Sequence, residues 1–383
     1  MNSIINNENR NYKIPELPLD IDLETKNVMR QLNLANKRLA ELKGVAQTIP
    51  NEIILINTLI LQEAKDSSAI ENIVTTHDEL FRAEIDLKQY AISASTKEVL
   101  NYSAALKHGF ELIRKDGLLT NARIKDIQQI LEGNRAGFRS VHGTTLKRND
   151  GTIVYTPPQS KQEIEQYMAN LELFINDDSV SDIDPLIKMA IVHHQFESIH
   201  PFYDGNGRTG RIVNILYLVT QKLLDLPILY LSRYIIQNKT EYYALLQGVR
   251  DTNDWERWII FILKGVEQTA INTIWLVKEI SSLMLRFKHN IRPLLGKSYR
   301  HDLLNNLFSH PYTKISFVQD ILQVSRITAT QYLDKIVAAG LLKKIKSGRD
   351  NYYLNMPLCE LFINSSDFHS SENEDIIESI HEK

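Results

Sequence analysis

The chain has 383 residues, 43% of them hydrophobic and 24% charged, and a formal net charge of -3. This composition predicts a folded globular protein of roughly two or three domains, and the charge excludes a surface built throughout to coat nucleic acid. One cysteine, Cys359, excludes an internal disulfide framework and fits a reducing cytosol. No apolar run reaches the ~18 residues of a membrane span, and the first residues do not resemble a signal peptide, so we expect a cytoplasmic protein without a membrane segment.

The N-terminal part of the chain predicts helices. Apolar residues at helical spacing indicate a helix over residues 23–42, and Gly44 is expected to end it. Pro50 opens the next helix, which is apolar nearly all round over residues 53–61. Such a helix is buried between others.

The pattern changes after two further helices, which are predicted near residues 96–113 and 120–131. Between residues 138 and 158, strand-like residues at Val141 and 153–155 lie on either side of an Asp-Gly pair. Two such runs around Asp-Gly predict a β-hairpin.

Two adjacent histidines lie on the helix that Pro185 opens. His193 and His194 would point about 100° apart on a helix and therefore do not make a natural chelating pair. The sequence contains no Cys or His spacing typical of zinc. We expect both histidines to pack inside the protein.

The residues with the most chemical information run from His200 to Arg211 and read His-Pro-Phe-Tyr-Asp-Gly-Asn-Gly-Arg-Thr-Gly-Arg. The glycines let the backbone turn tightly, and the apolar run that follows predicts a buried helix whose N-terminus favours phosphate. Two arginines add donors, Asp204 offers the oxygen ligand that Mg²⁺ prefers, and His200 is the one base here with a pKa near neutrality. Together they predict chemistry on a nucleotide phosphate.

These twelve residues match the Fic motif, His-x-Phe-x-(Asp/Glu)-Gly-Asn-Gly-Arg-x-x-Arg, at every fixed position. The sequence therefore resembles Fic family protein adenylyltransferases over roughly residues 50–285. The resemblance implies a mainly α fold, in which a Fic-type helical core carries a small β-hairpin flap. It divides the chain into an N-terminal helical region (1–115), a catalytic core (116–285), a winged helix-turn-helix domain (286–360) and an acidic disordered tail (361–383).

The resemblance also implies roles for individual residues. His200 would be the catalytic base, and Asp204 would hold the Mg²⁺ of ATP. Phe202 would anchor the loop, and a tyrosine near position 243 would border the nucleotide base. The flap would lie over the site and pair with the backbone of the target protein; an incidental surface hairpin is the alternative. The predicted nucleotide-binding residues are Glu71, Thr152, Ile153, Val154, Tyr155, Asp204, Gly205, Asn206, Gly207, Arg208, Thr209, Gly210, Arg211, Tyr242 and Tyr243.

A second motif lies far upstream. Ser67 and Glu71 are four residues apart, so they share one face of a helix. With Asn72 they resemble the inhibitory motif (Ser/Thr)-x-x-x-Glu-(Gly/Asn) that accompanies many Fic domains. The resemblance implies that Glu71 pairs with Arg211 and forces ATP into an unproductive pose. A solvated glutamate at a capped turn is the alternative.

The C-terminal part resembles a winged helix-turn-helix, with predicted helices at 302–308, 316–322 and 325–339 followed by a hairpin. Residues 312–356 carry seven Lys or Arg and three Asp, a net charge of +4. DNA-reading modules are usually more basic. DNA binding through residues 316–354 therefore stands beside a protein-contact or dimerising role.

The sequence thus predicts an enzyme that transfers AMP from ATP to a Ser, Thr or Tyr hydroxyl of a target protein and of itself. Two other interpretations stay open. One is a DNA-binding transcriptional regulator with a nucleotide-sensing Fic core. The other is a Fic enzyme that transfers another nucleotide or removes AMP. A homodimer is compatible with the apolar N-terminal helices.

Overall fold

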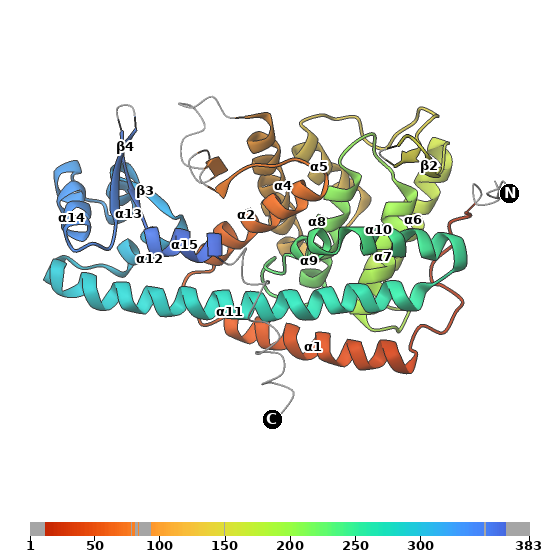
Figure 1. Ribbon diagram of the computed structural model, residues 1–383, viewed down its shortest axis with the longest axis horizontal. Coiled ribbons are helices and arrows are strands. Elements are labelled where there is room, and N and C mark those ends of the chain that lie inside the picture. The colour runs from red at the N-terminus through yellow and green to blue at the C-terminus, as the bar shows by residue number, and fades with distance from the viewer. Residues whose placement is uncertain are drawn as a thin grey trace. The chain divides into compact units, whose positions relative to one another are not determined.

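The computed structural model describes residues 12–77, 79–80, 83, 93–148, 150–347 and 350–364. Most of these residues are helical, which confirms the mainly α prediction (Figure 1). The first part of the chain contains α1 (Lys26–Ala46), α2 (Glu52–Ile70), α4 (Ala94–Asp116), α5 (Asn121–Glu132), β1 (Leu146–Lys147), β2 (Ile153–Tyr155), α6 (Lys161–Asn176), α7 (Pro185–Ile199), α8 (Asn206–Thr220), α9 (Ser232–Gln237) and α10 (Lys239–Thr252). The rest contains α11 (Trp255–Leu295), the 3₁₀ turn η2 (Gly296–Ser298), α12 (His301–Ser309), β3 (Tyr312–Lys314), α13 (Ile315–Leu322), α14 (Arg326–Ala338), β4 (Lys343–Ser347), β5 (Asp350–Leu354) and α15 (Met356–Asn364).

The described residues divide into two compact units. The first unit comprises those of Met1–Lys43, Leu59–Val74 and Ser93–Ile271, and the second those of Gly44–Thr58, Thr75–Ile92 and Asn272–Lys383. α4 packs against α5 and α8 within the first unit. The expected domain boundaries stay predictions.

α7 and α8 form the centre of the first unit (Figure 1). The Asp184 side chain caps α7 by accepting a hydrogen bond from Leu186 N at 2.8 Å, and Pro185 occupies the first turn, where its missing N–H costs nothing. Every residue from Leu186 to Ile199 is buried, and α8 packs against α7, α4 and α5. The loop between these two helices is therefore held on rigid supports.

Two local predictions are corrected by the structure. Gly44 does not end the first helix, which continues to Ala46; a glycine inside a helix costs only about 1 kcal/mol relative to alanine. The hairpin is present, but its first arm is β1 at Leu146–Lys147, and Val141 lies in a bend with 64% of its surface exposed. Its turn is closed by Gly151 N donating to Arg148 O at 2.9 Å.

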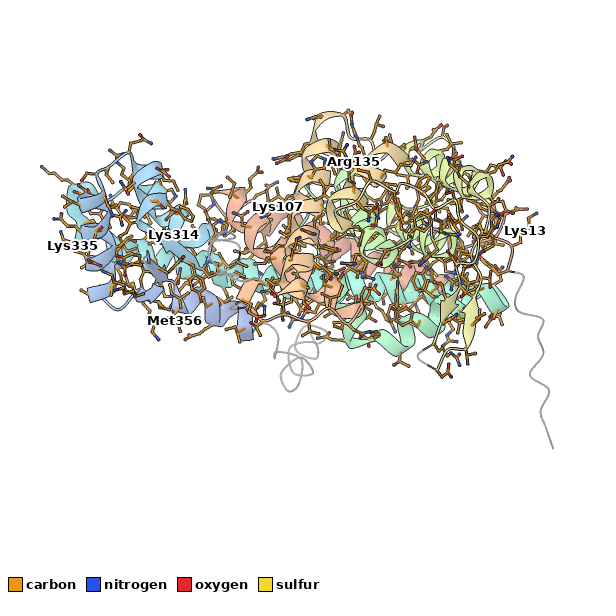
Figure 2. All side chains as sticks on the ribbon, turned by 90° about the horizontal axis from the view of Figure 1, so that it is seen from above. Lys13, Lys107, Arg135, Lys314, Lys335 and Met356 are labelled. Carbon is orange, nitrogen blue, oxygen red and sulfur yellow. The ribbon has the colours of Figure 1, made fainter. Side chains whose placement is uncertain are left out.

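The second unit contains the predicted order of helices and a hairpin. Its sheet is antiparallel in the order β3-β5-β4, with Tyr312 and Lys343 both in register with Leu354. On α14, Lys335 is exposed (Figure 2), whereas Lys344 of the hairpin is paired with Asp334 at 2.8 Å. The use of this unit as a DNA-reading winged helix stays a prediction.

One described helix, α11 with its extension to Ser298, is long and apolar enough to cross a membrane by length and composition alone. Within its most apolar window, 61% of the residues are buried inside the protein. A core helix of a soluble protein has the same properties, so the observation is weak evidence for a membrane span.

Candidate functional site

The loop between α7 and α8 places an imidazole directly before a helix N-terminus. α7 ends at His200, which has a left-handed backbone (φ 50°), and α8 begins after Gly205, which is left-handed as well (φ 75°). The Asn206 carboxamide closes the loop, because it accepts from Phe202 N at 2.8 Å and donates to Phe202 O at 2.9 Å. The Phe202 ring is fully buried, as the motif predicted. Both ends of the Asn206 side chain are therefore engaged within the loop.

Arg139, a buried arginine that sequence analysis did not identify, donates hydrogen bonds to the backbone that carries His200. Arg139 donates from Nε to His200 O at 2.7 Å and from Nη2 to Ile199 O at 3.3 Å, and it also contacts Pro158 O. Its backbone N–H donates to Pro201 O at 2.8 Å. A guanidinium at the last carbonyls of α7 compensates the partial negative charge of that helix end. Arg139 thereby fixes the backbone that carries the imidazole.

The pKa of His200 is lowered to about 4, chiefly by burial and further by the charges of Arg139 and Arg250, against the opposing effect of Glu71. At neutral pH the imidazole is therefore uncharged and can accept a proton. The neighbouring Glu197 is buried, and burial raises the pKa of its carboxyl to about 7. The two groups have pKa values shifted in opposite directions.

This arrangement predicts the effect of pH on any reaction in which His200 accepts the proton. Activity should rise with pH through the lowered pKa, below 6.5, because only the neutral imidazole is a base. Replacing Arg139 by Gln should raise the pKa of His200 and move this limb to higher pH. Initial rates between pH 4 and 8 measure the shift. A limb that stays in place in the Arg139 variant would contradict its assignment to His200.

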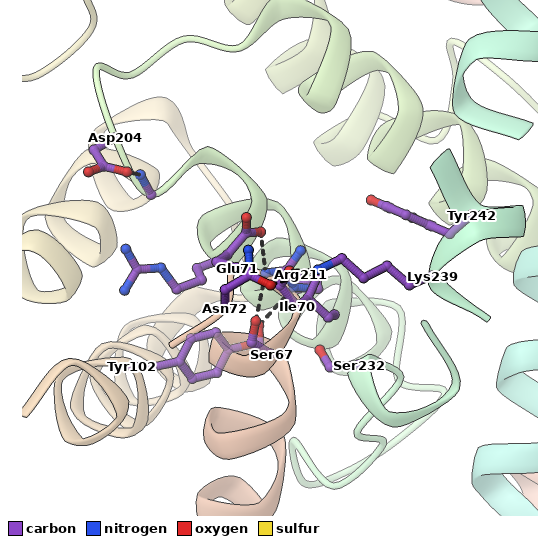
Figure 3. A network of polar contacts seen from close by, with 12 residues as sticks. Ser67, Ile70, Glu71, Asn72, Tyr102, Asp204, Arg211, Ser232, Lys239 and Tyr242 are labelled. Atoms are coloured by element: carbon purple, nitrogen blue, oxygen red, sulfur yellow. Dashed lines mark hydrogen bonds and ion pairs between the residues drawn. The ribbon is translucent and has the colours of Figure 1, made fainter. Parts of the chain in front are cut away.

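Arg211, on the second turn of α8, is held by the motif on α2 (Figure 3). Its Nε donates to Ser67 Oγ at 2.8 Å, and its Nη2 donates to Ser67 O at 3.0 Å and to Glu71 Oε1 at 2.9 Å. The Arg211 side chain is 3% exposed and that of Glu71 is 35% exposed. Burial alone would raise the pKa of Glu71, but Arg211 outweighs it and holds the pKa below its usual value. The predicted pairing of Glu71 with Arg211 is present.

The Glu71 carboxylate also touches the first turn of α8. A Cβ added at Gly207 would come within 2.5 Å of Glu71 Oε1 and 3.0 Å of Arg211 Nη1. Glycine at 207 therefore permits the carboxylate to approach the helix N-terminus, where backbone N–H groups favour an anion. One anion already lies between this helix end and a buried guanidinium.

The remaining loop residues differ in what they contact. Arg208 is 5% exposed and pairs with Glu98 of α4 at 3.1 Å and Glu132 of α5 at 2.9 Å. These glutamates lie far from the motif in sequence, so no local pattern could have identified them. Asp204 is exposed, its Oδ1 accepts from Gly205 N at 2.7 Å, and Figure 3 shows it away from the Glu71–Arg211 pair. Thr209 and Gly210 are buried inside the first turns of α8.

Two tyrosines predicted to bind nucleotide are buried in the structure. Tyr155 of the flap is 4% exposed, donates to Ser198 O at 2.9 Å and packs under Arg250, whose Cζ lies 4.1 Å from the ring centroid. Tyr242 is 1% exposed, and its hydroxyl lies 2.8 Å from His193 Nε2. Neither ring presents an exposed face here, and the nucleotide-binding role of both residues stays a prediction. Tyr155 ties the flap to α7.

The neighbouring positions remain available. Tyr243 is 45% exposed, and on the flap Ile153 is 40% exposed while Val154 is partly buried and Thr152 is exposed.

The two adjacent histidines that were predicted to pack inside the protein, His193 and His194, are completely buried, and burial lowers the pKa of each imidazole. They pack among the aromatic rings of Trp255 and Trp258, which confirms the packing role.

Three family models match this chain. The model of the Fic/DOC family N-terminal region matches residues 29–111, that of the Fic/DOC family matches residues 118–218, and that of the protein adenylyltransferase SoFic-like C-terminal domain matches residues 283–358. The second match contains the whole loop and its two supporting helices. The chain belongs to the Fic/DOC family.

Relatives and solved structures agree with this assignment. The protein adenylyltransferase fic-1 of Caenorhabditis elegans is 28% identical over 162 residues, which cover 42% of this chain and 30% of the relative. The protein adenylyltransferase Fic of Aedes aegypti is 26% identical over 185 residues, 48% of this chain and 35% of the relative. This chain thus spans about a third of the length of these curated relatives. A Fic family protein from Desulfovibrio desulfuricans G20 shares the fold, with a TM-score of 0.56 and 20% identity over 88% of this chain and 97% of that one.

Proposed function

We propose that this protein transfers AMP from ATP to a Ser, Thr or Tyr hydroxyl of a target protein, and to itself. The observation that carries the proposal is the position of a neutral imidazole, His200, directly before a helix N-terminus that already accommodates an anion beside Arg211. The names of the relatives, protein adenylyltransferases, support the same reaction.

In the proposed reaction, His200 accepts the proton of the target hydroxyl. The hydroxyl oxygen forms a bond to the α-phosphorus, and the bond from that phosphorus to the oxygen bridging to the β-phosphorus breaks. Pyrophosphate leaves with the electron pair of the broken bond. Backbone N–H groups at Asn206 and Gly207 would hold the α- and β-phosphates, and Arg211 would hold the γ-phosphate. Arg208 would exchange a glutamate partner for phosphate when nucleotide enters.

Mg²⁺ fits this site through Asp204. A Mg²⁺ ion bound with a nucleotide commonly takes one or two carboxylates together with phosphate oxygens, and Asp204 is an exposed carboxylate held at the loop by Gly205 N. Among the described residues no group of three His, Cys, Asp or Glu could hold a metal ion alone. When bound, the ion would neutralise phosphate charge.

We further propose that Glu71 inhibits the enzyme. Its carboxylate occupies the anion position between Gly207 and Arg211, so a γ-phosphate and Glu71 would compete for one guanidinium. Since Arg211 is nearly buried, it cannot turn towards solvent to serve both. ATP would then bind with its phosphates displaced from in-line attack until Glu71 moves away.

The test is transfer of label from ATP carrying ³²P at the α-phosphate, with the purified protein as both enzyme and target. We expect label in the protein band, and none when the ³²P is at the γ-phosphate. Competition by unlabelled ATP, GTP, UTP and CTP then identifies the base. Label transferred from another nucleotide in preference to ATP would support a different Fic chemistry, and failure with every nucleotide would contradict the proposal.

A further inference from the structure

A lysine at the start of α10 holds the turn that carries Glu71. The Lys239 Nζ donates to Ile70 O at 2.5 Å and to Asn72 Oδ1 at 3.3 Å. These two acceptors belong to the residues on either side of Glu71, and Figure 3 shows the Lys239 side chain extending to this turn. The contacts link two elements that are distant in sequence, the end of α2 and the first residue of α10.

The end of α2 needs such a partner. The last carbonyl groups of a helix accept no hydrogen bond from an N–H group of the same helix, and they carry partial negative charge. A lysine ammonium can donate to these carbonyls and stabilise this charge. The backbone reverses at Asn72, which is left-handed (φ 64°), and Glu71 N and Ile73 N both donate to Ser68 O at 3.0 Å. Short terminal turns of this kind open readily unless side chains hold them.

The position of the Glu71 carboxylate depends on this turn. Glu71 is 35% exposed and accepts one hydrogen bond from Arg211 at 2.9 Å, whereas Ser67 accepts two from the same guanidinium. A partly exposed ion pair contributes little stabilising free energy when one of its side chains must first be ordered. Fixing the backbone on both sides of Glu71 removes most of that ordering cost.

We propose that Lys239 is a positioning residue for inhibition, which keeps Glu71 on Arg211 by holding the turn at Ile70–Asn72. The inference rests on the proposed inhibitory role of Glu71. It also connects inhibition to α10, the helix whose exposed Tyr243 lies one turn further along the same face. A displacement of α10 would withdraw the ammonium from the turn and free Glu71.

The experiment compares Lys239→Met with the unchanged protein and with Glu71→Gly. Methionine preserves the length of the stem but removes the charge and the donors. We expect transfer of AMP to rise roughly three- to tenfold in Lys239→Met, as expected for the loss of a cation at a helix C-terminus together with its hydrogen bonds. In the Glu71→Gly background the same change should have no further effect. Lys264→Met, an exposed lysine of α11, is the matched control.

A second measurement separates this inference from the inhibitory role itself. Hydrogen exchange at the amides of Glu71, Asn72 and Ile73 should accelerate in Lys239→Met and stay unchanged in Lys264→Met. Unchanged exchange would overturn the inference even if Glu71→Gly is activated. Accelerated exchange with no activation by Glu71→Gly would refute the inhibitory role, and Lys239 would then hold the turn without a part in inhibition. A loss of ATP affinity and transfer in both backgrounds would make Lys239 a nucleotide ligand and would also overturn the inference.

Discussion

Replacing His200 by Ala is expected to reduce transfer of AMP by at least about a hundredfold, because general base catalysis contributes roughly 10² to 10⁴ in rate. The physical reason is local: the imidazole is partly buried, uncharged at neutral pH and placed beside the helix N-terminus that would hold the phosphates. The substitution removes a base and no phosphate ligand, so nucleotide binding should persist. Label transfer from α-labelled ATP and binding of ATP by calorimetry measure the two effects separately.

The control for this prediction must exclude damage to the loop. Position 200 has a left-handed backbone, which histidine adopts more readily than alanine, so the thermal unfolding of His200→Ala must be measured to show that the variant is folded. His289→Ala, at an exposed histidine of α11, should transfer AMP at the parent rate. Transfer that survives in a folded His200→Ala protein would refute the role of the imidazole.

The parts of the site that could be predicted are those whose geometry is local. Ser67 and Glu71 are one helical turn apart, so their common face follows from the period of the helix, and both reach Arg211. Likewise, glycine at 205 satisfies a left-handed backbone (φ 75°) where the loop enters α8. The pairing of Glu71 with Arg211 was implied by the resemblance of both segments to Fic motifs, since no local pattern connects residue 71 with residue 211.

The parts that could not be predicted depend on packing. Tyr242 and Tyr243 are adjacent, so rotation by about 100° along the helix turns one into the core and the other to the surface. Nothing in their sequence neighbourhood decides which is which. The burial of Tyr155 could not be predicted for the same reason, because the buried face of a three-residue strand is set by the residues that it packs against, here Ser198 and Arg250.

Buried charge was the other feature that sequence reasoning missed. Glu98 and Glu132 neutralise Arg208, and Arg139 supports His200, although all three come from outside the motif. Each is required because a buried charge or helix end without a partner is costly. The sequence states that Arg208 is present, but the partner that satisfies it depends on how α4 and α5 pack against α8.

Replacing Glu71 by Gly is expected to raise transfer, including self-modification, by about tenfold or more. A hydrogen bond to a charged group contributes roughly 1.5–3 kcal/mol, and because the Glu71 side chain is 35% exposed, solvent screening favours the lower end of this range for its contact with Arg211. The glycine variant leaves Arg211 anchored by Ser67 alone and leaves the first turn of α8 without its anion. Initial rates of label transfer at saturating ATP measure the change.

The decisive comparison is between Glu71→Gly and Glu71→Gln. Glutamine keeps the shape of the side chain and the steric contact at Gly207, but it cannot form an ion pair with Arg211. If charge is what holds the inhibitory arrangement, Glu71→Gln should be activated almost as strongly as Glu71→Gly. If the side chain blocks the phosphate by its volume, only the glycine variant should be activated. If both variants transfer AMP at the rate of the unchanged protein, residues 67–72 are only the end of a helix and have no inhibitory role. Arg211 would then need no release from Glu71 before it binds a phosphate.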